Sequence, residues 1–269
     1  MKFIIACDLE GIHGVVGEPY KTLNETPDYE RAVLGAELEI GAVARALYDN
    51  GAEKVILWDN HGGGGNLDLA RLDLRLVPAD AKGNSLRADF ARGDKIDGVV
   101  YLGYHAREGR PCGVLAHTYN SKMIQYVKLN GKSIGELYVD SRIFANLGIK
   151  SIFHAGDDVS VAEMKEYCPH ALTVITKYGK GRNSADLRDR EDVLREIYEG
   201  VSEAVRRLYE PYECLFPDNP NLEVRYTRAE LAAEMYEKAK RLGIPVSYGE
   251  DTHILHLDIA RANQITLFL

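Results

Sequence analysis

The sequence contains little cysteine and no long apolar run. Its four cysteines are Cys7, Cys112, Cys168 and Cys214. No two of them form a Cys-x-x-Cys pair, which argues against a zinc ribbon or a disulfide framework. No apolar stretch approaches the roughly 20 residues that a membrane-spanning helix needs. The opening segment MKFIIACD places an acid where the apolar region of a signal peptide would continue. We therefore expect a cytoplasmic protein without a membrane partner.

Positive charge is also in short supply. The 269 residues include 33 lysines and arginines against 41 aspartates and glutamates, which gives a net charge of -8. A surface that binds polyanions needs the opposite balance, so nucleic acid is not an expected partner. The hydrophobic share of 45% and the charged share of 28% are those of an ordinary globular protein. The length allows one large domain or two moderate ones.

Short apolar runs alternate with helical patterns through about residue 155. Four runs predict buried strands, over residues 2–7, 54–58, 99–102 and 151–155. Apolar positions spaced for one face of a helix fill residues 28–50, and residues 135–147 form a second predicted helix between two strands. Strands separated by helices indicate an α/β fold, with a mostly parallel sheet that carries helices on both faces.

The remaining sequence predicts a smaller second unit. Residues 185–209 are typical of a long amphipathic helix, and residues 222–269 of a strand, a helix and two further strands. We therefore divide the chain into an α/β domain over residues 1–175 and a smaller C-terminal α+β domain over residues 176–269. Asn130-Gly131 between extended residues predicts a β-hairpin. This hairpin is either an arm that contacts another subunit or a plain surface feature.

Polar residues follow three of the predicted strands at the points where those strands end. Asp8 and Glu10 follow the first strand, His61 follows the second, and His105 follows the strand at residues 99–102. The carboxyl ends of parallel strands meet at one edge of a sheet, where α/β proteins build their sites. Two acids at the end of a buried strand are costly unless a positive group meets them.

This convergence of two acids and two histidines favours a metal site over the ordinary alternatives. Taken alone, the two acids are typical of a capping or solvated pair, and a histidine at a strand end is more often simply hydrogen-bonded. Imidazole and carboxylate are common ligands of zinc in hydrolytic sites. Two ions held about 3.5 to 4 Å apart can share a hydroxide and clamp a carbonyl oxygen.

Several short motifs also occur in a specific order along residues 1–185. They are MKFIIACDLEG, Trp58-Asp59-Asn60-His61, Gly103-Tyr104-His105-Ala106, Ala116-His117-Thr118, Ile134-Gly135-Glu136-Leu137 and Ala155-Gly156-Asp157-Asp158. The ordered set resembles the zinc-dependent D-aminopeptidase family, metallopeptidases of the dipeptide-transport-operon type. The resemblance implies a dinuclear zinc enzyme that removes the N-terminal residue of short peptides, with D-amino-acid peptides such as D-Ala-D-Ala as substrates. It also implies a homo-oligomeric ring of subunits.

The resemblance further implies roles for individual residues. The ligands of two zinc ions per chain would be Asp8, Glu10, His61, His105 and Glu136, with Asp8 as the bridge. Three carboxylates against two Zn²⁺ leave one positive charge, which a bridging hydroxide would neutralise before it attacks the scissile carbonyl. His117 would be a catalytic residue outside the ligand set, donating a proton to the leaving amine or steadying the oxyanion. The plainer alternative is that His117 caps a loop.

Other functions use the same residues. A zinc amidase or an L-aminopeptidase would show the same ligands, because their spacing does not encode the handedness of a substrate. Asp8-Leu9-Glu10-Gly11 also resembles the Asp-x-Asp motif of haloacid dehalogenase-like phosphatases, which points to a di-metal phosphohydrolase, although two histidine ligands are not expected there. A protein that binds metal without catalysis is the third alternative.

Three further features of the sequence allow two interpretations each. Asp59 either orients a ligand histidine or belongs to turn chemistry. The run Gly62–Gly65 either lets backbone approach a substrate or supplies a mobile loop. Arg182 either binds a peptide carboxylate or is a solvated loop charge.

Overall fold

The larger part of the fold is a seven-stranded sheet with the order β3-β2-β1-β4-β7-β8-β9. The computed structural model describes residues 1–79, 95–211 and 214–269. The strands of this sheet are β1 (Lys2–Cys7), β2 (Lys54–Asp59), β3 (Val77–Pro78), β4 (Gly98–Leu102), β7 (Lys150–Asp157), β8 (Leu172–Gly181) and β9 (Ser184–Leu187). Every neighbouring pair is parallel except β8 and β9. The predicted mostly parallel sheet is therefore confirmed.

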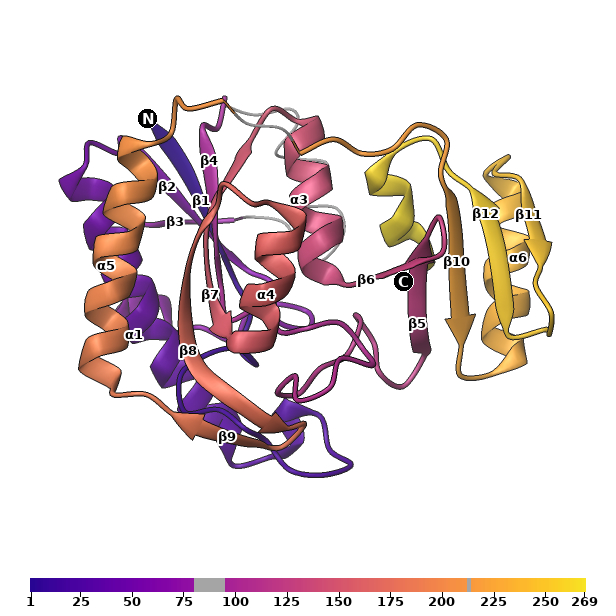
Figure 1. The fold of residues 1–269 in the computed structure, drawn as a ribbon, viewed down its shortest axis with the longest axis horizontal. Helices are drawn as coiled ribbons and strands as arrows, with labels where there is room; N and C mark the ends of the chain where they lie inside the picture. Colours follow the sequence, from indigo (N-terminus) through magenta and orange to yellow (C-terminus); the bar gives the residue numbers. More distant parts are fainter. Residues whose placement is uncertain (80–94, 212–213) are drawn as a thin grey trace.

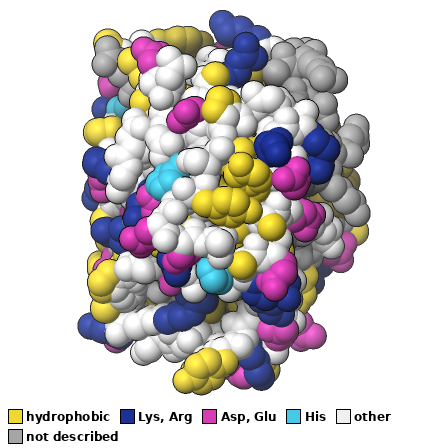
Figure 2. All heavy atoms as spheres, turned by 90° about the vertical axis from the view of Figure 1, so that its right-hand side faces the viewer, with side chains coloured by type: hydrophobic (Ala, Val, Ile, Leu, Met, Phe, Trp, Pro, Cys, Tyr) yellow, Lys and Arg dark blue, Asp and Glu magenta, His cyan; other side chains and the backbone are white. Residues whose placement is uncertain are grey.

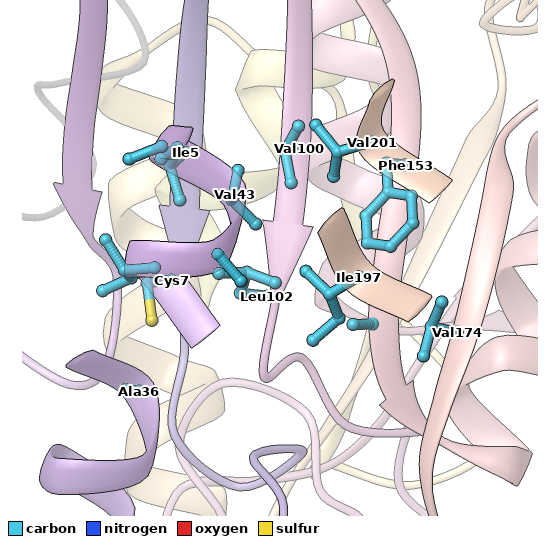
Figure 3. Close-up of a cluster of buried hydrophobic side chains, with 14 of the residues drawn as sticks. Ile5, Cys7, Ala36, Val43, Val100, Leu102, Phe153, Val174, Ile197 and Val201 are labelled. Atoms are coloured by element: carbon cyan, nitrogen blue, oxygen red, sulfur yellow. The ribbon is translucent and has the colours of Figure 1, made fainter. Parts of the chain in front are cut away.

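Helices cover both faces of this sheet (Figure 1). The helices α1 (Asp28–Asp49) and α5 (Arg190–Arg206) lie on one face, and α3 (Glu136–Asn146) and α4 (Asp158–Tyr167) on the other. Successive residues of a strand point to opposite faces, so Ile5 of β1 joins the core under α1 and α5 while Ile4 joins the core under α3. Figure 3 shows the first of these cores, where Val43 and Ile197 meet the strands. Burial of both faces explains why the strands are continuous apolar runs.

A second, antiparallel sheet of five strands stands beside the first (Figure 1). Its strands, in spatial order, are β11 (Val246–Tyr248), β12 (Ile254–Asp258), β10 (Asn221–Tyr226), β5 (Ile124–Leu129) and β6 (Lys132–Ile134). The helix α6 (Ala229–Arg241) and the 3-10 helix η3 (Ala262–Phe268) pack on it. Between the sheets, α3 places Leu137 and Phe144 in the core of the first and Val139 and Ile143 in the core of the second.

The two sheets do not divide the chain at one point. The expected boundary between residues 175 and 176 falls inside β8. The strands β8 and β9 belong to the larger sheet, and α5 packs on it. The β5–β6 hairpin, from the middle of the chain, belongs to the smaller sheet. The predicted Asn130-Gly131 turn is confirmed, with φ of 49° and 80° at its two residues. The hairpin is not a free arm, because β5 pairs with β10 along its length. The division into two domains stays a prediction.

The face that the smaller sheet and α6 present shows acidic and basic side chains mixed together (Figure 2). A group of hydrophobic side chains lies among them, near the centre of that view. No single sign of charge dominates this face. Among the described residues, no helix is both long enough and apolar enough to cross a bilayer.

The register of the central strands brings their carboxyl ends to the same level. Cys7, the last residue of β1, lies opposite Asp59 of β2 on one side and Leu102 of β4 on the other. The loops that follow these three strands therefore begin side by side. Two short 3-10 helices, η1 (Leu23–Glu25) and η2 (Leu69–Arg71), lie in the segments after β1 and β2.

Candidate metal centre

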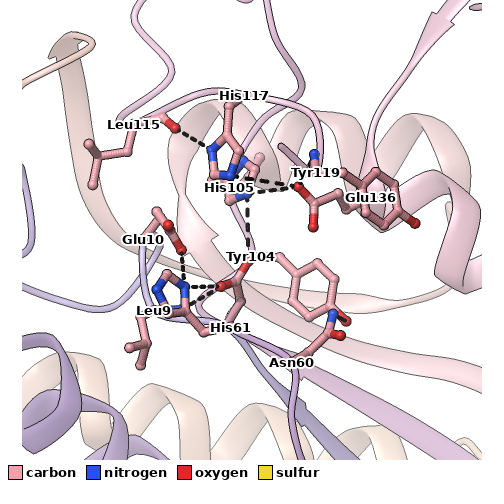
Figure 4. Close-up of polar contacts among 12 residues, drawn as sticks. Leu9, Glu10, Asn60, His61, Tyr104, His105, Leu115, His117, Tyr119 and Glu136 are labelled. Carbon is pink, nitrogen blue, oxygen red and sulfur yellow. Dashed lines mark hydrogen bonds and ion pairs between the residues drawn. The ribbon is translucent and has the colours of Figure 1, made fainter. Parts of the chain in front are cut away.

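Asp8, Glu10 and His61 form one group of potential ligand atoms at this edge. His61 Nδ1 lies 3.0 Å from Asp8 Oδ1 and 3.1 Å from Glu10 Oε2. The side chains come from the loops after β1 and β2, and all three residues are buried. Figure 4 shows the Glu10 carboxylate pointing toward the His61 imidazole. The spatial meeting predicted from strand ends is thus present.

A second group shares Asp8 with the first. His105 Nε2 lies 3.6 Å from Asp8 Oδ2 and 3.3 Å from Glu136 Oε1. Asp8 therefore directs one oxygen toward each group. Within the described parts of the chain, two groups of three residues have potential ligand atoms that all lie within 4.8 Å of one another. One group is Asp8, Glu10 and His105, and the other is His105, His117 and Glu136. The two groups of three have His105 in common.

The histidines each have one ring nitrogen anchored away from the carboxylates. His61 Nε2 lies 2.5 Å from Asn24 Oδ1, and His105 Nδ1 lies 2.9 Å from the carbonyl oxygen of Ala106. Both partners only accept hydrogen bonds, so the proton of each neutral ring belongs on the anchored nitrogen. His61 Nδ1 and His105 Nε2 are then free to bind a cation. Outer hydrogen bonds of this kind are typical of histidine ligands.

Two glycines allow the ligand loops to pack backbone against backbone. Gly11 donates its N–H to the carbonyl of Gly103 over 2.6 Å. A Cβ on Gly103 would lie 2.0 Å from the Asp8 carbonyl oxygen, and the φ of Gly103 is +68°. A Cβ on Gly11 would lie 2.5 Å from the Tyr104 carbonyl oxygen. No other residue fits either position, and this close contact sets the distance between Asp8 and His105.

His117 lies on a tightly bent loop beside this centre. Its ring stacks on that of His105, with centroids 3.9 Å apart and planes at 14°. His117 Nδ1 donates to the carbonyl of Leu115 over 2.8 Å, which leaves Nε2 directed toward Glu136 Oε1 at 3.9 Å. Leu115 and Tyr119 have φ of 52° and 57°, which side chains rarely adopt. The loop is therefore held in place by its surroundings.

Arg182 is one of the residues that hold this loop. Its guanidinium donates to the carbonyl of Ala116, and its own carbonyl accepts the N–H of Leu115 over 2.7 Å. Both contacts are made with the two residues that precede His117. Neither sequence interpretation of Arg182 anticipates this contact, in which the turn between β8 and β9 supports the loop.

Glu136 is the first residue of α3, where the unpaired N–H groups of the helix favour a negative charge. Its Oε1 also accepts the N–H of Tyr119 over 2.6 Å. Glu136 is 9% exposed and His105 is 3% exposed. The first residue of α3 thus places a carboxylate beside His105 at the edge of the larger sheet.

Burial and mutual charge shift the pKa values of these groups strongly. Burial disfavours the charged forms of His61 and His105, but the carboxylates beside them outweigh it and raise their pKa values to about 11 and about 10. Burial and the charge of Glu10 raise the pKa of Asp8 to about 7. Glu136 is also buried, but its bond to His105 lowers its pKa to about 2. Without metal, the histidines supply the positive charge that the acids need.

His117 is shifted in the opposite direction. Burial, and then the charge of His105, lower the pKa of its imidazole. The ring is therefore neutral at neutral pH, with its free lone pair on Nε2. A neutral imidazole in this position is able to accept a proton and return it.

Asp59 belongs to turn chemistry. Its Oδ2 accepts the N–H of Asn66 over 2.6 Å, and its Oδ1 accepts the Asn66 side-chain amide over 2.8 Å. The same amide donates to the carbonyl of His61 over 2.8 Å. Asp59 therefore closes the loop that contains Gly62–Gly65 and carries His61. A Cβ on Gly62, Gly63 or Gly65 would meet no atom within 4 Å, whereas one on Gly64 would lie 3.1 Å from the Asp59 carbonyl oxygen.

A pocket of about 460 Å³ opens directly onto these groups. Ligand pockets in proteins commonly measure about 300 to 1,000 Å³. Its walls come from the segments that follow β1 and β2, the loop before β5, the start of α3 and the C-terminal residue. They include Asn24, Tyr119, Asn120 and Leu269 beside the acids and His61. A small peptide placed in this pocket would reach His117 as well as the carboxylates.

Comparison with known proteins identifies the family. The sequence profile of peptidase family M55, described as D-aminopeptidase, matches residues 1–245. The chain belongs to the D-aminopeptidase family. As a family member it is a peptide hydrolase, which sets aside the phosphohydrolase and the protein without catalysis.

A curated relative and a solved structure agree with this assignment. The D-aminopeptidase of Bacillus subtilis (strain 168) is 25% identical over 228 residues, which span 84% of this chain and 81% of that protein. The structure described as "Zn-dependent D-aminopeptidase DppA from Bacillus subtilis, a self-compartmentalizing protease" superposes with a TM-score of 0.84 at 21% identity. That match covers 100% of this chain and 95% of the other, and it confirms the fold predicted here.

Sequence reasoning about this D-aminopeptidase family member missed two supporting residues. Asn24, which anchors His61, lies in a segment without periodic pattern, so no sequence signal points to it. Lys177 lies in the apolar stretch of β8 and is fully buried. A lysine inside an apolar strand is a detectable signal, because a buried ammonium needs partners.

Proposed function

We propose that the chain is a dinuclear zinc aminopeptidase that removes the N-terminal residue from short peptides, with D-amino-acid peptides such as D-Ala-D-Ala as substrates. The observation that carries this proposal is the position of Asp8, whose two oxygens face His61 Nδ1 at 3.0 Å and His105 Nε2 at 3.6 Å. We assign Asp8 as the bridging ligand. Glu10 and His61 would complete one half of the site, and His105 and Glu136 the other.

The donor set fits zinc. It combines three buried carboxylates with two imidazole nitrogens, His61 Nδ1 and His105 Nε2, whose rings are anchored through their other nitrogen. Carboxylate oxygen and imidazole nitrogen are common ligands of zinc. Bound zinc would supply a Lewis acid for the scissile carbonyl and would lower the pKa of water. The name of the Bacillus structure, a Zn-dependent D-aminopeptidase, supports both the metal and the substrate class. Its description as self-compartmentalizing supports a homo-oligomeric ring for this chain.

We assign proton transfer to His117. Its Nδ1 is held by the Leu115 carbonyl, and its neutral ring has a free Nε2 that faces the carboxylate cluster. Nε2 would take a proton from the attacking water and give it to the leaving amine. Its stacking on His105 keeps the ring at a fixed orientation during both transfers. General acid–base catalysis of this kind contributes about 10² to 10⁴-fold in rate.

The direct test measures zinc and turnover in the same preparation. Protein purified without chelator is analysed for metal by plasma emission, and release of alanine is measured from D-Ala-D-Ala and from L-Ala-L-Ala. We expect two zinc ions per chain and release from the D-peptide alone. Release from the L-peptide would replace the proposed substrate class with an L-aminopeptidase. Two zinc ions with no release from either peptide would point to an amidase or to longer peptides.

Zinc binding is expected to release protons. The pKa values of about 11 for His61 and about 10 for His105 mean that both rings are protonated at pH 7.5 in metal-free protein. Because a ligand nitrogen must lose its proton, filling the site would release about two protons, and zinc affinity would rise with pH. Calorimetric titrations of Zn²⁺ into metal-free protein, in buffers with different ionisation enthalpies, measure this number. His61→Ala should release one proton fewer, and binding without proton release would contradict the assignment.

A further inference from the structure

Lys177 is a buried cation whose partners are backbone carbonyls. Its Nζ donates to the carbonyl oxygens of Glu10 at 2.6 Å, Ile12 at 2.8 Å and Val15 at 2.7 Å. The residue is 0% exposed. An ammonium group has three N–H donors, so these three bonds use all of them. The segment that follows Glu10 is therefore wrapped around the head of this one side chain.

A register shift in β8 turns Lys177 toward that segment. Ile175 pairs with Gly156 and Lys177 with Asp157, so Thr176 is an extra residue in the strand. A bulge of this kind breaks the alternation of side chains, and both Thr176 and Lys177 are buried. Thr176 Oγ1 donates to the carbonyl of Gly11 over 2.6 Å. Two consecutive residues of β8 thus bind consecutive carbonyls of the ligand loop.

The two acids of this loop are anchored by different strands. Asp8 is fixed from β4, because its N–H donates to the Leu102 carbonyl over 2.8 Å. Glu10 is fixed from β8, through the bond between its carbonyl and Lys177. The Glu10 carboxylate then reaches His61 Nδ1 at 3.1 Å. Loss of the lysine would leave the Glu10 carbonyl without this partner, so that, among the described residues, the peptide between Glu10 and Gly11 is held only through the Gly11 N–H on the Gly103 carbonyl, while the anchor of Asp8 remains.

We propose that Lys177 is a positioning residue that holds Glu10 in place for metal binding. Removing the lysine side chain should therefore lower the zinc affinity of the half of the site formed by Glu10 and His61, and not that of the other half. The inference rests on the proposed dinuclear site. The half with His105 and Glu136 depends on the loop after β4 and on the start of α3, neither of which contacts Lys177 Nζ through the bonds described above. A merely structural role would weaken both halves together or neither.

The test compares zinc affinities in Lys177→Met, which keeps the unbranched apolar stem and removes the ammonium. Zn²⁺ is titrated into metal-free protein in competition with a chromophoric chelator. We expect the dissociation constant of one zinc ion to rise about 10- to 100-fold, as for other residues that orient metal ligands, and that of the second to stay nearly unchanged. In a Glu136→Gln background the substitution should raise the dissociation constant of the zinc ion held by Glu10 and His61 by the same factor, and in a His61→Ala background it should have little further effect on zinc binding.

Lys150→Met is the matched control. Lys150 Nζ also donates to two backbone carbonyls, Leu208 at 2.5 Å and Glu210 at 3.0 Å, but these are remote from the ligand loops in sequence and fold. Both variants lose lysine-to-carbonyl bonds and are expected to melt at lower temperature than the wild type. Only Lys177→Met should lose zinc. Equal weakening of both zinc ions by Lys177→Met, or an unchanged affinity for both, would overturn the inference.

A milder variant covers the case in which Lys177→Met does not fold. Thr176→Val removes one hydroxyl bond to Gly11 at nearly constant volume and should weaken the same zinc ion by a smaller factor. Unchanged affinities in that variant would count against the inference. A wild-type protein that binds fewer than two zinc ions would contradict the proposed function itself, whichever result Lys177→Met gives.

Discussion

Replacing Asp8 with asparagine is expected to remove zinc from both halves of the site and to lower kcat/KM by about 10³-fold or more, because metal catalysis supplies several kcal/mol to the reaction. Asp8 is the residue with an oxygen facing each imidazole, at 3.0 Å and 3.6 Å. Asparagine keeps the shape and the Oδ1 that accepts the N–H of Leu9 over 2.8 Å. The measurements are zinc content and release of D-alanine from D-Ala-D-Ala.

The same variant is expected to leave the metal-free fold intact or to stabilise it. Burial and the charge of Glu10 raise the pKa of Asp8 from 3.8 to about 7, so the folded state holds this proton more tightly than the unfolded chain. The contribution of Asp8 to the stability of the metal-free wild type should therefore fall as the pH rises from about 4 to about 7. Asparagine has no such titration. A melting temperature far below that of metal-free wild type at pH 8 would show that lost activity reflects unfolding.

Replacing His117 with asparagine is expected to lower kcat by about 10² to 10⁴-fold while both zinc ions stay bound, since proton transfer by a positioned side chain contributes that much. Asparagine can still donate to the Leu115 carbonyl, which His117 Nδ1 contacts at 2.8 Å, but it has no counterpart of Nε2. Steady-state kinetics with D-Ala-D-Ala and zinc analysis on the same samples are the measurements.

Zinc content distinguishes the two possible roles of this histidine. His117, His105 and Glu136 also have potential ligand atoms within 4.8 Å of one another, so His117 could itself bind metal. Loss of one zinc ion in His117→Asn would assign it to the ligand set and contradict proton transfer as its role. Unchanged kcat with full zinc would reduce it to a loop cap. Arg182→Ala, which removes the side-chain contact to Ala116 beside His117, serves as a comparison for loop effects alone.

Much of the fold follows from local sequence pattern. The strands at residues 2–7, 54–58, 99–102 and 151–155 are buried on both faces, so their apolar runs identify them without help from the rest of the chain. The Asn130-Gly131 turn is encoded by two residues that tolerate positive φ. The fold brings two of the four scattered cysteines together, with Cys168 Sγ 3.4 Å from Cys214 Sγ. Strand ends also place Asp8, Glu10, His61 and His105 at one edge.

Other decisions required the tertiary structure. No local pattern could place the β5–β6 hairpin in the same sheet as β10, because that pairing joins residues nearly 100 positions apart. For the same reason the sequence could not show that β8 pairs with β7 and that α5 packs on α1. Sheets are completed by partners distant in the chain, and periodicity carries no information about which partner that is.

The sequence by itself determined which carboxylates and histidines gather and at which edge of the sheet. The tertiary structure decided how these side chains and their loops are held, with Asn24 bonded to His61, Arg182 bonded to the residue before His117 and Lys177 bonded to the Glu10 carbonyl. A strand end fixes where a side chain starts, and that position is local information. Orientation depends on hydrogen bonds to groups up to 167 residues away, which exist only after the chain has closed on itself.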